Sequence, residues 1–167
     1  MAEQDGTFDL DQVPGSEVTD QPQVALIAQY VKDLSFENPN APAVYQWQTQ
    51  PEINVNFNIA SQVAGEDVYE VQLKIDIHAT GGGQTAFRVD LLFAGLFGIR
   101  NVPEEQLQPF LFAEAPRLLF PFARRVVSDS VRDGNFPPLL LEPIDFGALY
   151  MQQQAQAQGN PGDIGQA

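Results

Sequence analysis

The sequence predicts an α+β fold in which a four-stranded antiparallel sheet carries helices on one face. Four segments alternate apolar and polar residues, which places successive side chains on opposite faces of a sheet. The helical patterns all come later, after residue 103. Each strand pattern is polar on one side only, which antiparallel sheets allow and buried parallel sheets do not. We therefore expect one solvated face and one apolar face covered by helices.

The first alternating segment, residues 24–37, is the least regular of the four. Its end is clear, with Asp33, Ser35 and Glu37 on one side and Leu34 and Phe36 on the other. It leads into the proline-rich residues 38–42, which are too long and stiff for a tight hairpin.

The next three segments are regular. Between Ile53 and Ile59 every odd residue is apolar and every even residue is Asn, and residues 69–79 continue the same rule. Gly81–Gly83 predicts a hairpin turn into a strand at residues 87–93.

Three helices are predicted after the strands. Pro103 is expected at the first helical position, followed by acidic residues that favour a helix start. A stronger amphipathic pattern runs from about Pro121 to Asp133, with Gly134 as its C-cap. A short third helix is expected from Phe146 to about Gln154.

A single folded domain is expected between two flexible ends. Residues 1–22 contain six acidic residues, no basic residue and several Gly and Pro, which predicts a disordered acidic arm. The folded domain is predicted at residues 23–154. Residues 155–167 are rich in Gln, Ala and Gly and are expected to form a flexible tail.

The composition restricts the partners and the chemistry. The net charge of -14 disfavours nucleic acid and favours basic, partly apolar polypeptides. The absence of cysteine excludes disulfides, thiolate metal sites and cysteine nucleophiles. The sequence shows no signal peptide and no apolar stretch long enough to span a membrane, so we expect a cytoplasmic protein.

No catalytic or metal site is indicated, and no cofactor is expected. The single histidine, His78, falls on a polar strand face, where a solvated edge residue is the better interpretation. Gly81–Gly83 lacks the lysine of a phosphate loop. A hot-dog-like thioesterase on a helix-backed sheet is the enzymatic alternative, but no catalytic acid at a helix end stands out.

Apolar residues exceed the need of one sheet and one helical layer. The chain has 12 Phe, and residues 118–122 and 136–141 are dense apolar clusters. Such a surplus marks an interface or a binding groove, while many of these residues must also serve the core.

Residues 32–42, KDLSFENPNAP, resemble the signature of the SecB family of protein-export chaperones. The resemblance continues in order over residues 24–154, including Gln50–Ile53, Thr85–Phe87, Leu119–Arg124 and Gly134–Pro137. It implies a four-stranded sheet with helices on one side, assembled as a dimer of dimers. It also implies a chaperone that holds unfolded precursors without ATP and delivers them to the translocase motor SecA.

The resemblance assigns two groups of residues. The SecA-docking face corresponds to Asp33, Glu37 and Asp90, with Arg88 at a docking position where an apolar residue is expected. The client groove corresponds to Ile53, Val55, Phe57, Leu149 and Tyr150.

Two positions depart from the family pattern. Trp47 is slightly displaced from the family's tryptophan, and the tail after Gly159 lacks an acidic, motor-binding ending. A SecB-like chaperone for another client, such as a toxin–antitoxin system, is the alternative function.

Overall fold

The computed structural model describes residues 20–159. A four-stranded antiparallel sheet has the strand order β1-β4-β3-β2, so β1 and β2 form its edges. The strands are β1 (Gln23–Glu37), β2 (Glu52–Gly65), β3 (Val68–Gly81) and β4 (Gln84–Arg100). The helices are α1 (Glu104–Pro109), α2 (Ala115–Asp133) and α3 (Phe146–Gly159). The predicted fold class, a helix-backed antiparallel sheet, is confirmed.

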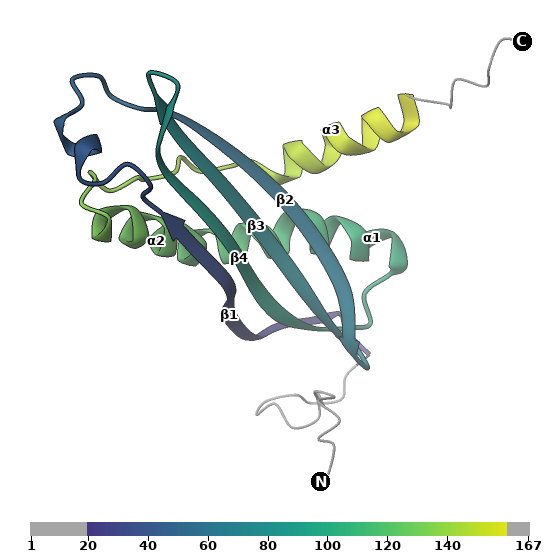
Figure 1. Cartoon of the computed structure of the whole chain (residues 1–167). Coiled ribbons are helices and arrows are strands. Elements are labelled where there is room, and N and C mark those ends of the chain that lie inside the picture. The colour runs from purple at the N-terminus through teal and green to yellow at the C-terminus, as the bar shows by residue number, and fades with distance from the viewer. Residues whose placement is uncertain (1–19, 160–167) are drawn as a thin grey trace, which may run out of the picture.

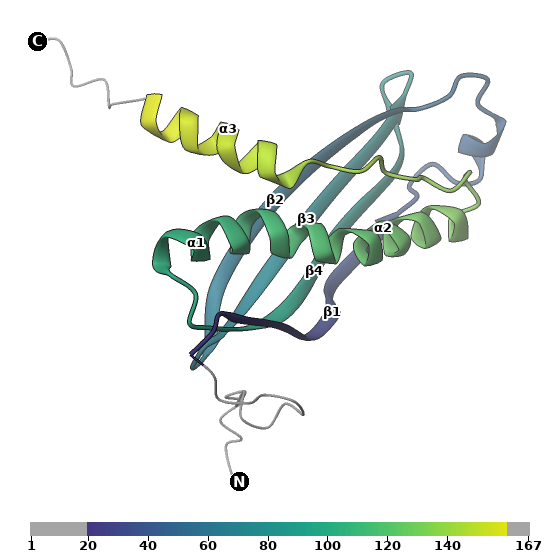
Figure 2. The ribbon, with the colours of Figure 1, turned by 180° about the vertical axis from the view of Figure 1, so that it is seen from behind.

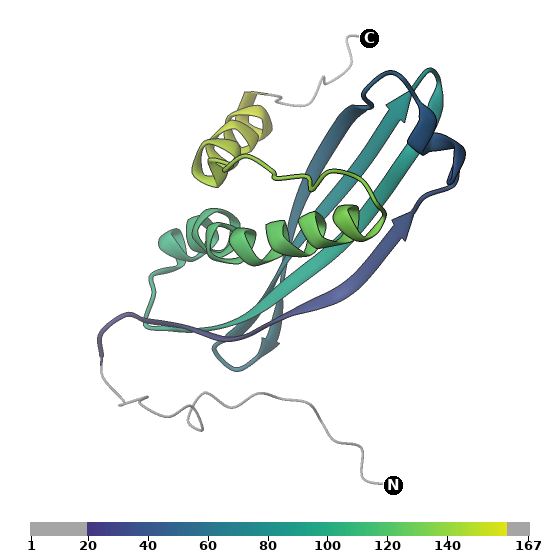
Figure 3. The same ribbon diagram turned by 90° about the vertical axis from the view of Figure 1, so that its left-hand side faces the viewer.

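The molecule has two layers. Helices α1 and α2 run end to end across one face of the sheet, joined by a π-helical turn at Phe110–Glu114 (Figures 2 and 3). Helix α3 lies on the same side and projects past the sheet, and within residues 20–159 the opposite face carries no helix (Figure 1). We call the face toward the helices the inner face and the opposite one the outer face.

The core lies between the inner face and α2. On β3 the side chains of Val71, Leu73, Ile75 and Ile77 are completely buried, and Leu119, Ala123 and Val127 of α2 are completely buried above the sheet. The period-two pattern of β3 and the helical stripe of α2 thus meet across one interface. The alternation predicted for residues 53–59, 69–79 and 87–93 is confirmed in β2, β3 and β4.

The predicted hairpin joins β3 to β4. Gly82 and Gly83 have φ angles of 57° and 79°, a left-handed conformation that glycine adopts without a steric penalty. His78 faces outward as expected, but β3 is an interior strand, and the imidazole Nε2 lies 3.0 Å from Thr85 Oγ1. His78 is therefore half-buried and hydrogen-bonded rather than a solvated edge residue.

The irregular pattern of residues 24–37 has a structural cause. Strand β1 pairs with β4 through two register shifts, one between Leu26 and Ala28 and one between Val31 and Asp33. Each shift leaves one residue of β1 unpaired, as in a β-bulge, so the alternation changes phase twice. The final frame puts Asp33, Ser35 and Glu37 on the outer face, as predicted.

Three helix boundaries differ from the prediction. Helix α2 begins at Ala115 rather than Pro121, because the π-helical turn continues the helical backbone from α1 and Pro121 lies inside the helix. Pro103 is the N-cap of α1 rather than its first helical residue. Helix α3 continues to Gly159, so residues 155–159, expected in a flexible tail, are helical. The predicted arm up to residue 19 and the tail from residue 160 lie outside the described residues.

Gly134 is the C-cap of α2, as predicted, but not for its backbone freedom. Its φ is -79°, and the left-handed residue is Asn135, with a φ of 65°. A Cβ on Gly134 would lie 2.3 Å from Cζ of Phe36. Glycine is needed here because the end of α2 packs directly on the ring of Phe36 from β1.

Candidate functional site

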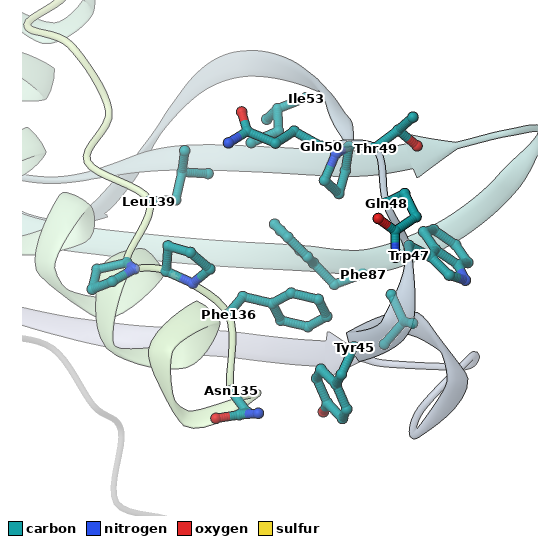
Figure 4. A pocket seen from close by; sticks show the side chains of 14 residues that line it. Tyr45, Trp47, Gln48, Thr49, Gln50, Ile53, Phe87, Asn135, Phe136 and Leu139 are labelled. Carbon is teal, nitrogen blue, oxygen red and sulfur yellow. The ribbon is translucent and has the colours of Figure 1, made fainter.

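An open groove lies at the end of the inner face that is farthest from α1. Its volume is about 510 Å³. It is bounded by the segment that follows β1, the start of β2, the inner face of β4 and the segment that follows α2 (Figure 4). The lining side chains are mainly aromatic, aliphatic and proline: Val44, Tyr45, Trp47, Pro51, Ile53, Phe87, Phe136, Pro137, Pro138 and Leu139, with Gln48, Thr49, Gln50 and Asn135.

Hydrogen bonds hold the segment after β1 against the end of α2. The Tyr45 hydroxyl donates to the carbonyl of Gly134 at 2.9 Å, and Asn38 Nδ2 donates to Tyr45 Oη at 2.8 Å. Asn40 Nδ2 donates to the carbonyl of Thr85 at 2.7 Å. These bonds connect residues up to 89 positions apart and fix one wall of the groove relative to the sheet.

Aromatic rings form the floor of the groove. The ring of Phe136 packs against Phe87 and Tyr45, with centroid distances of 4.8 and 5.7 Å, and Phe87 packs on Phe36 at 6.2 Å. Trp47 covers Gly81, where a Cβ would approach the indole carbons to 3.2 Å. The groove therefore presents rigid aromatic surface, which binds apolar side chains with little loss of conformational entropy.

The five residues predicted for the client groove do not form one site. Ile53 lines the groove described above. Val55 and Phe57 continue from it along the inner face of β2, and Phe57 reaches Phe120 of α2 at a centroid distance of 6.3 Å. Leu149 and Tyr150 belong to α3, where Tyr150 stacks on Phe112 at 6.3 Å. The predicted residues thus outline an inner surface of which the groove is one end.

Sequence reasoning missed most of the groove. The missed walls are Tyr45 and Trp47 on one side and Phe136 to Leu139 on the other, separated by about 90 residues in the chain. A signal was present, because aromatic residues follow the proline-rich residues 38–42 and an apolar cluster occupies 136–141. Only the fold shows that these two segments face one another.

The four residues predicted for partner docking lie together on the outer face. In the sheet register Glu37 of β1 is opposite Arg88 of β4, and Ser35 is opposite Asp90. Asp33 precedes Ser35 by two residues and is opposite Leu92. On the other side of β4, Arg88 is opposite His78 and Asp90 is opposite Asp76 of β3. The structure brings the four together and adds Asp76, which the sequence analysis did not single out.

Asp76 and Asp90 form a carboxyl pair. Burial raises the pKa of Asp90 above its ordinary value, and the hydrogen bond to Asp76 and the repulsion between the two carboxylates raise it further. Arg88 and Lys74 act in the opposite direction. The outer face therefore holds two like charges side by side, an arrangement that a cationic partner group would relieve.

A second polar cluster on the outer face surrounds Glu70 of β3. This carboxylate is 6% exposed and accepts hydrogen bonds from Tyr30, Lys32, Gln62 and Gln72. Burial alone would raise its pKa, but the hydrogen bonds from Lys32, Tyr30 and Gln72 outweigh it and lower the pKa to about 2. Glu70 is thus a buried, ionised group that joins three strands.

Two further classes of site find no support in the described part of the chain. Within residues 20–159 no group of three or more His, Cys, Asp and Glu side chains is arranged to hold a metal ion. None of the helices in the same range combines the length and the hydropathy that crossing a membrane requires.

A solved structure shares this fold. A SecB-like chaperone from Mycobacterium tuberculosis, determined in complex with a peptide from the HigA1 antitoxin, superposes with a TM-score of 0.61 at 20% sequence identity. The match covers 72% of this chain and 90% of that one. The class of fold is therefore that of the SecB-like chaperones.

Sequence comparison gives the family. The profile described as "Preprotein translocase subunit SecB" matches residues 17–157. Proteins named protein-export protein SecB are similar to this chain: that of Rhizorhabdus wittichii is 76% identical over 81% of each chain, and that of Zymomonas mobilis is 67% identical over 81% of this chain and 82% of its own. That of Erythrobacter litoralis is 48% identical over 96% of this chain and 95% of its own. The chain belongs to the SecB family.

Proposed function

We propose that the protein is an ATP-independent export chaperone that holds unfolded precursor proteins in the cytoplasm and delivers them to the SecA motor. The observation that carries the proposal is the open aromatic groove at the end of an apolar strand face. Relatives at 48 to 76% identity bear the name protein-export protein SecB, which supports the same role.

Client binding is proposed to rest on hydrophobic burial. The groove of Tyr45, Trp47 and Phe136 opens onto Ile53, from which Val55 and Phe57 lead along β2. A few hundred Å² of apolar area contributes several kcal/mol at about 25 cal/mol per Å², before the cost of ordering the client. Each site therefore binds weakly, and several sites on one assembly hold a long chain firmly. A folded protein offers no extended apolar segment and is not bound.

Strand β2 offers a matched pair of variants to test the groove. Ile53 and Val63 both face inward on β2, with exposed fractions of 43% and 73%, but only Ile53 lines the groove. Ile53→Asp is expected to weaken binding of a denatured precursor at least about tenfold, and Val63→Asp to have little effect. Affinity is measured by fluorescence anisotropy, with aggregation followed by light scattering in the absence of nucleotide. Equal effects of the two variants, or no suppression of aggregation by the unmodified chain, would contradict holding through this groove.

Self-association is proposed to involve two exposed apolar surfaces. Along β1 the inner side chains of Val24, Leu26, Val31 and Leu34 are each 40 to 46% exposed at an edge of the sheet. On α2, in the helical layer, Leu118 and Phe122 are exposed. Two separate surfaces are what a dimer of dimers requires, and burial of each would remove an aggregation liability. A mass near four protomers of 18.4 kDa in light scattering is expected, and a monomer would overturn the assembly.

Delivery to SecA is proposed to use the outer face around Asp33, Glu37, Arg88 and Asp90. This surface is polar and helix-free and joins residues of adjacent strands, so it remains accessible while a client occupies the inner face. The two faces thus separate the two partners.

The docking proposal is tested by charge reversal with a matched control. Asp33→Lys combined with Glu37→Lys is expected to lower the affinity for SecA at least about tenfold. Glu104→Lys combined with Glu105→Lys on α1 changes the net charge equally, and should cost far less, because these exposed residues lie on the helical side. If SecA binding ignores the first pair while clients are still held, a chaperone for a non-export client, such as an antitoxin, becomes the better interpretation.

A further inference from the structure

The two bulges of β1 reverse the orientation of a short segment between them. Leu26 is opposite Phe97 on the inner face, Ala28 is opposite Leu96 on the outer face, and Ile27 is left unpaired. At the second bulge Val31 is opposite Phe93 on the inner face and Asp33 is opposite Leu92 on the outer face, so Lys32 is unpaired. Residues 28–31 therefore have the opposite orientation to that of an unbroken strand.

An unbroken strand would present a different inner face. Starting from Leu34 and Phe36, strict alternation would turn Lys32, Tyr30 and Ala28 toward the helices and Val31 toward the outside. It would return to the observed faces at Leu26, because two phase changes cancel, but Leu26 would then be opposite Ile99 instead of Phe97. The bulges thus change the faces of the middle of β1 and the pairing of its beginning. They take Ala28, Tyr30 and Lys32 off the inner face and put Gln29 and Val31 there.

The reversed segment has one polar anchor, the buried carboxylate of Glu70. Tyr30 Oη donates to Glu70, and Lys32 Nζ lies 2.7 Å from Glu70 Oε1. Strand β4 lies between β1 and β3, and Tyr30 is opposite the completely buried Ala94, whose methyl group leaves room for the longer side chains to cross. Only the double-bulged frame brings both Tyr30 and Lys32 to the face on which Glu70 lies.

The energetics favour the same frame. A buried carboxylate without partners is costly, so Glu70 stabilises whichever conformation of β1 supplies its donors. Gln62 and Gln72 donate to the same Oε1 at 3.0 and 2.6 Å, but they carry no charge. Burial and, next, the hydrogen bond to Glu70 raise the pKa of Tyr30 to about 12.

The reversal decides the composition of the apolar stripe on β1. With it, the stripe consists of Val24, Leu26, Val31 and Leu34, each 40 to 46% exposed, and Gln29 lies on the same face between Leu26 and Val31. Without it, an ammonium group at Lys32 would stand next to Leu34 in the middle of the same surface. We propose that Glu70 is a positioning residue for self-association, because it pins the bulges that keep Lys32 out of the stripe and Val31 in it. The inference rests on the proposed function, in which this stripe meets a second copy of the chain.

The orientation of Val31 is measured by NMR without reference to assembly. In methyl-labelled protein, Val31 should show a nuclear Overhauser effect to the ring of Phe93, its opposite residue on the inner face. Leu34 and Leu91 provide the matched control, because they are opposite one another on the inner face after the second bulge, where loss of the bulges changes neither face nor pairing. Light scattering of the same samples gives the mass of the assembly.

Glu70→Leu is expected to abolish the Val31–Phe93 effect, to leave the Leu34–Leu91 effect and to weaken association at least about tenfold. The charge-swapped pair Lys32→Glu with Glu70→Lys should restore the Val31–Phe93 effect and the association. If Glu70→Leu acted only through a loss of core packing, this pair would not restore them. The proposal is overturned if Glu70→Leu retains the Val31–Phe93 effect, or if it loses the Val31–Phe93 effect and the control effect together. It is also overturned if Val31 turns outward while the mass of the assembly stays unchanged. If Glu70→Leu does not fold, Glu70→Gln is tested instead, because it keeps the size of the side chain. The same changes in the nuclear Overhauser effects and in association are expected. A monomeric unmodified chain would refute the assembly proposal itself, while the NMR result would still decide whether Glu70 sets the orientation of Val31.

Discussion

The two faces of the sheet are stabilised by different forces. The inner face of β3 and β4 is apolar and packs against α2, where burial is non-directional and scales with area. The outer face of the same strands carries the carboxyl pair of Asp76 and Asp90 and the hydrogen-bonded Glu70. On that face stability depends on a few exact contacts, and like charges oppose it.

The comparison suggests a division of labour. Apolar surface that continues past the helices, as on β2 and in the groove, suits many unfolded sequences because hydrophobic contact has little directional preference. Charged surface with fixed register suits one partner, because electrostatic complementarity gives specificity. If the faces differ in this way, the changes that substitutions cause in the free energy of unfolding should differ in size, in sign and in their dependence on pH.

The largest effect is expected on the inner face, from Phe97→Ala. Phe97 is completely buried and meets the ring of Phe110 edge-on at a centroid distance of 5.8 Å. Truncation leaves a cavity that packed neighbours fill only in part, so the free energy of unfolding should fall by about 4 kcal/mol. Urea denaturation at a fixed protein concentration measures it. A loss below about 1 kcal/mol would show that the inner face is not the main source of stability.

The next effect concerns the polar anchor, Glu70→Gln. Because the folded-state pKa of Glu70 is lowered from 4.5 to about 2, its ionised form stabilises the fold above pH 4.5, by about 3 kcal/mol at pH 7. This contribution is lost as the pH falls from about 4.5 to about 2. The variant should therefore be less stable at pH 7 and lack that part of the acid dependence. Parallel curves of stability against pH for the two proteins would contradict the assignment.

An effect of opposite sign is expected for the carboxyl pair. The pKa of Asp90 is raised in the folded state, so its ionisation destabilises the fold at neutral pH and the penalty disappears as the pH falls through that raised value. Asp90→Asn should therefore increase the free energy of unfolding by about 0.5 kcal/mol at pH 7.

The neighbouring Asp76 provides the control for that gain. Asp76→Asn alone should give a similar increase, and the double variant should add little, because either change removes the same repulsion. A destabilised Asp90→Asn would show instead that Arg88 and Lys74 dominate the energy of this carboxylate.

The smallest effect is expected for Asn56→Ala. Asn56 is exposed on the outer face of β2, opposite Asp76. An exposed polar side chain outside a network contributes little, so the change in unfolding free energy should stay within about 0.5 kcal/mol. A clearly larger loss in urea denaturation would mean that the asparagines of β2 stabilise the outer face rather than only keep it polar.

The regular strands were predictable because side-chain direction in a strand is a local property. Residues 53–59 and 69–79 alternate strictly, and in the structure their faces agree with the pattern. Strand β1 was harder to predict, because its bulges depend on Glu70. This residue lies 38 residues after Lys32 in the chain and two strands away in the sheet. Helix α2 was predicted to start at Pro121, because a local rule treats proline as a boundary and does not consider a preceding helical turn that continues through it.

The sequence by itself determined the strand faces, the helix-backed sheet, the resemblance to SecB and the side of β1 that carries Asp33 and Glu37. Only the tertiary structure decided which distant segments meet: the wall of Tyr45 and Trp47 against Phe136, and Tyr30 and Lys32 against Glu70. The physical reason is that periodicity records which way a side chain points. What it points at depends on register, bulges and packing between residues that are far apart in the chain.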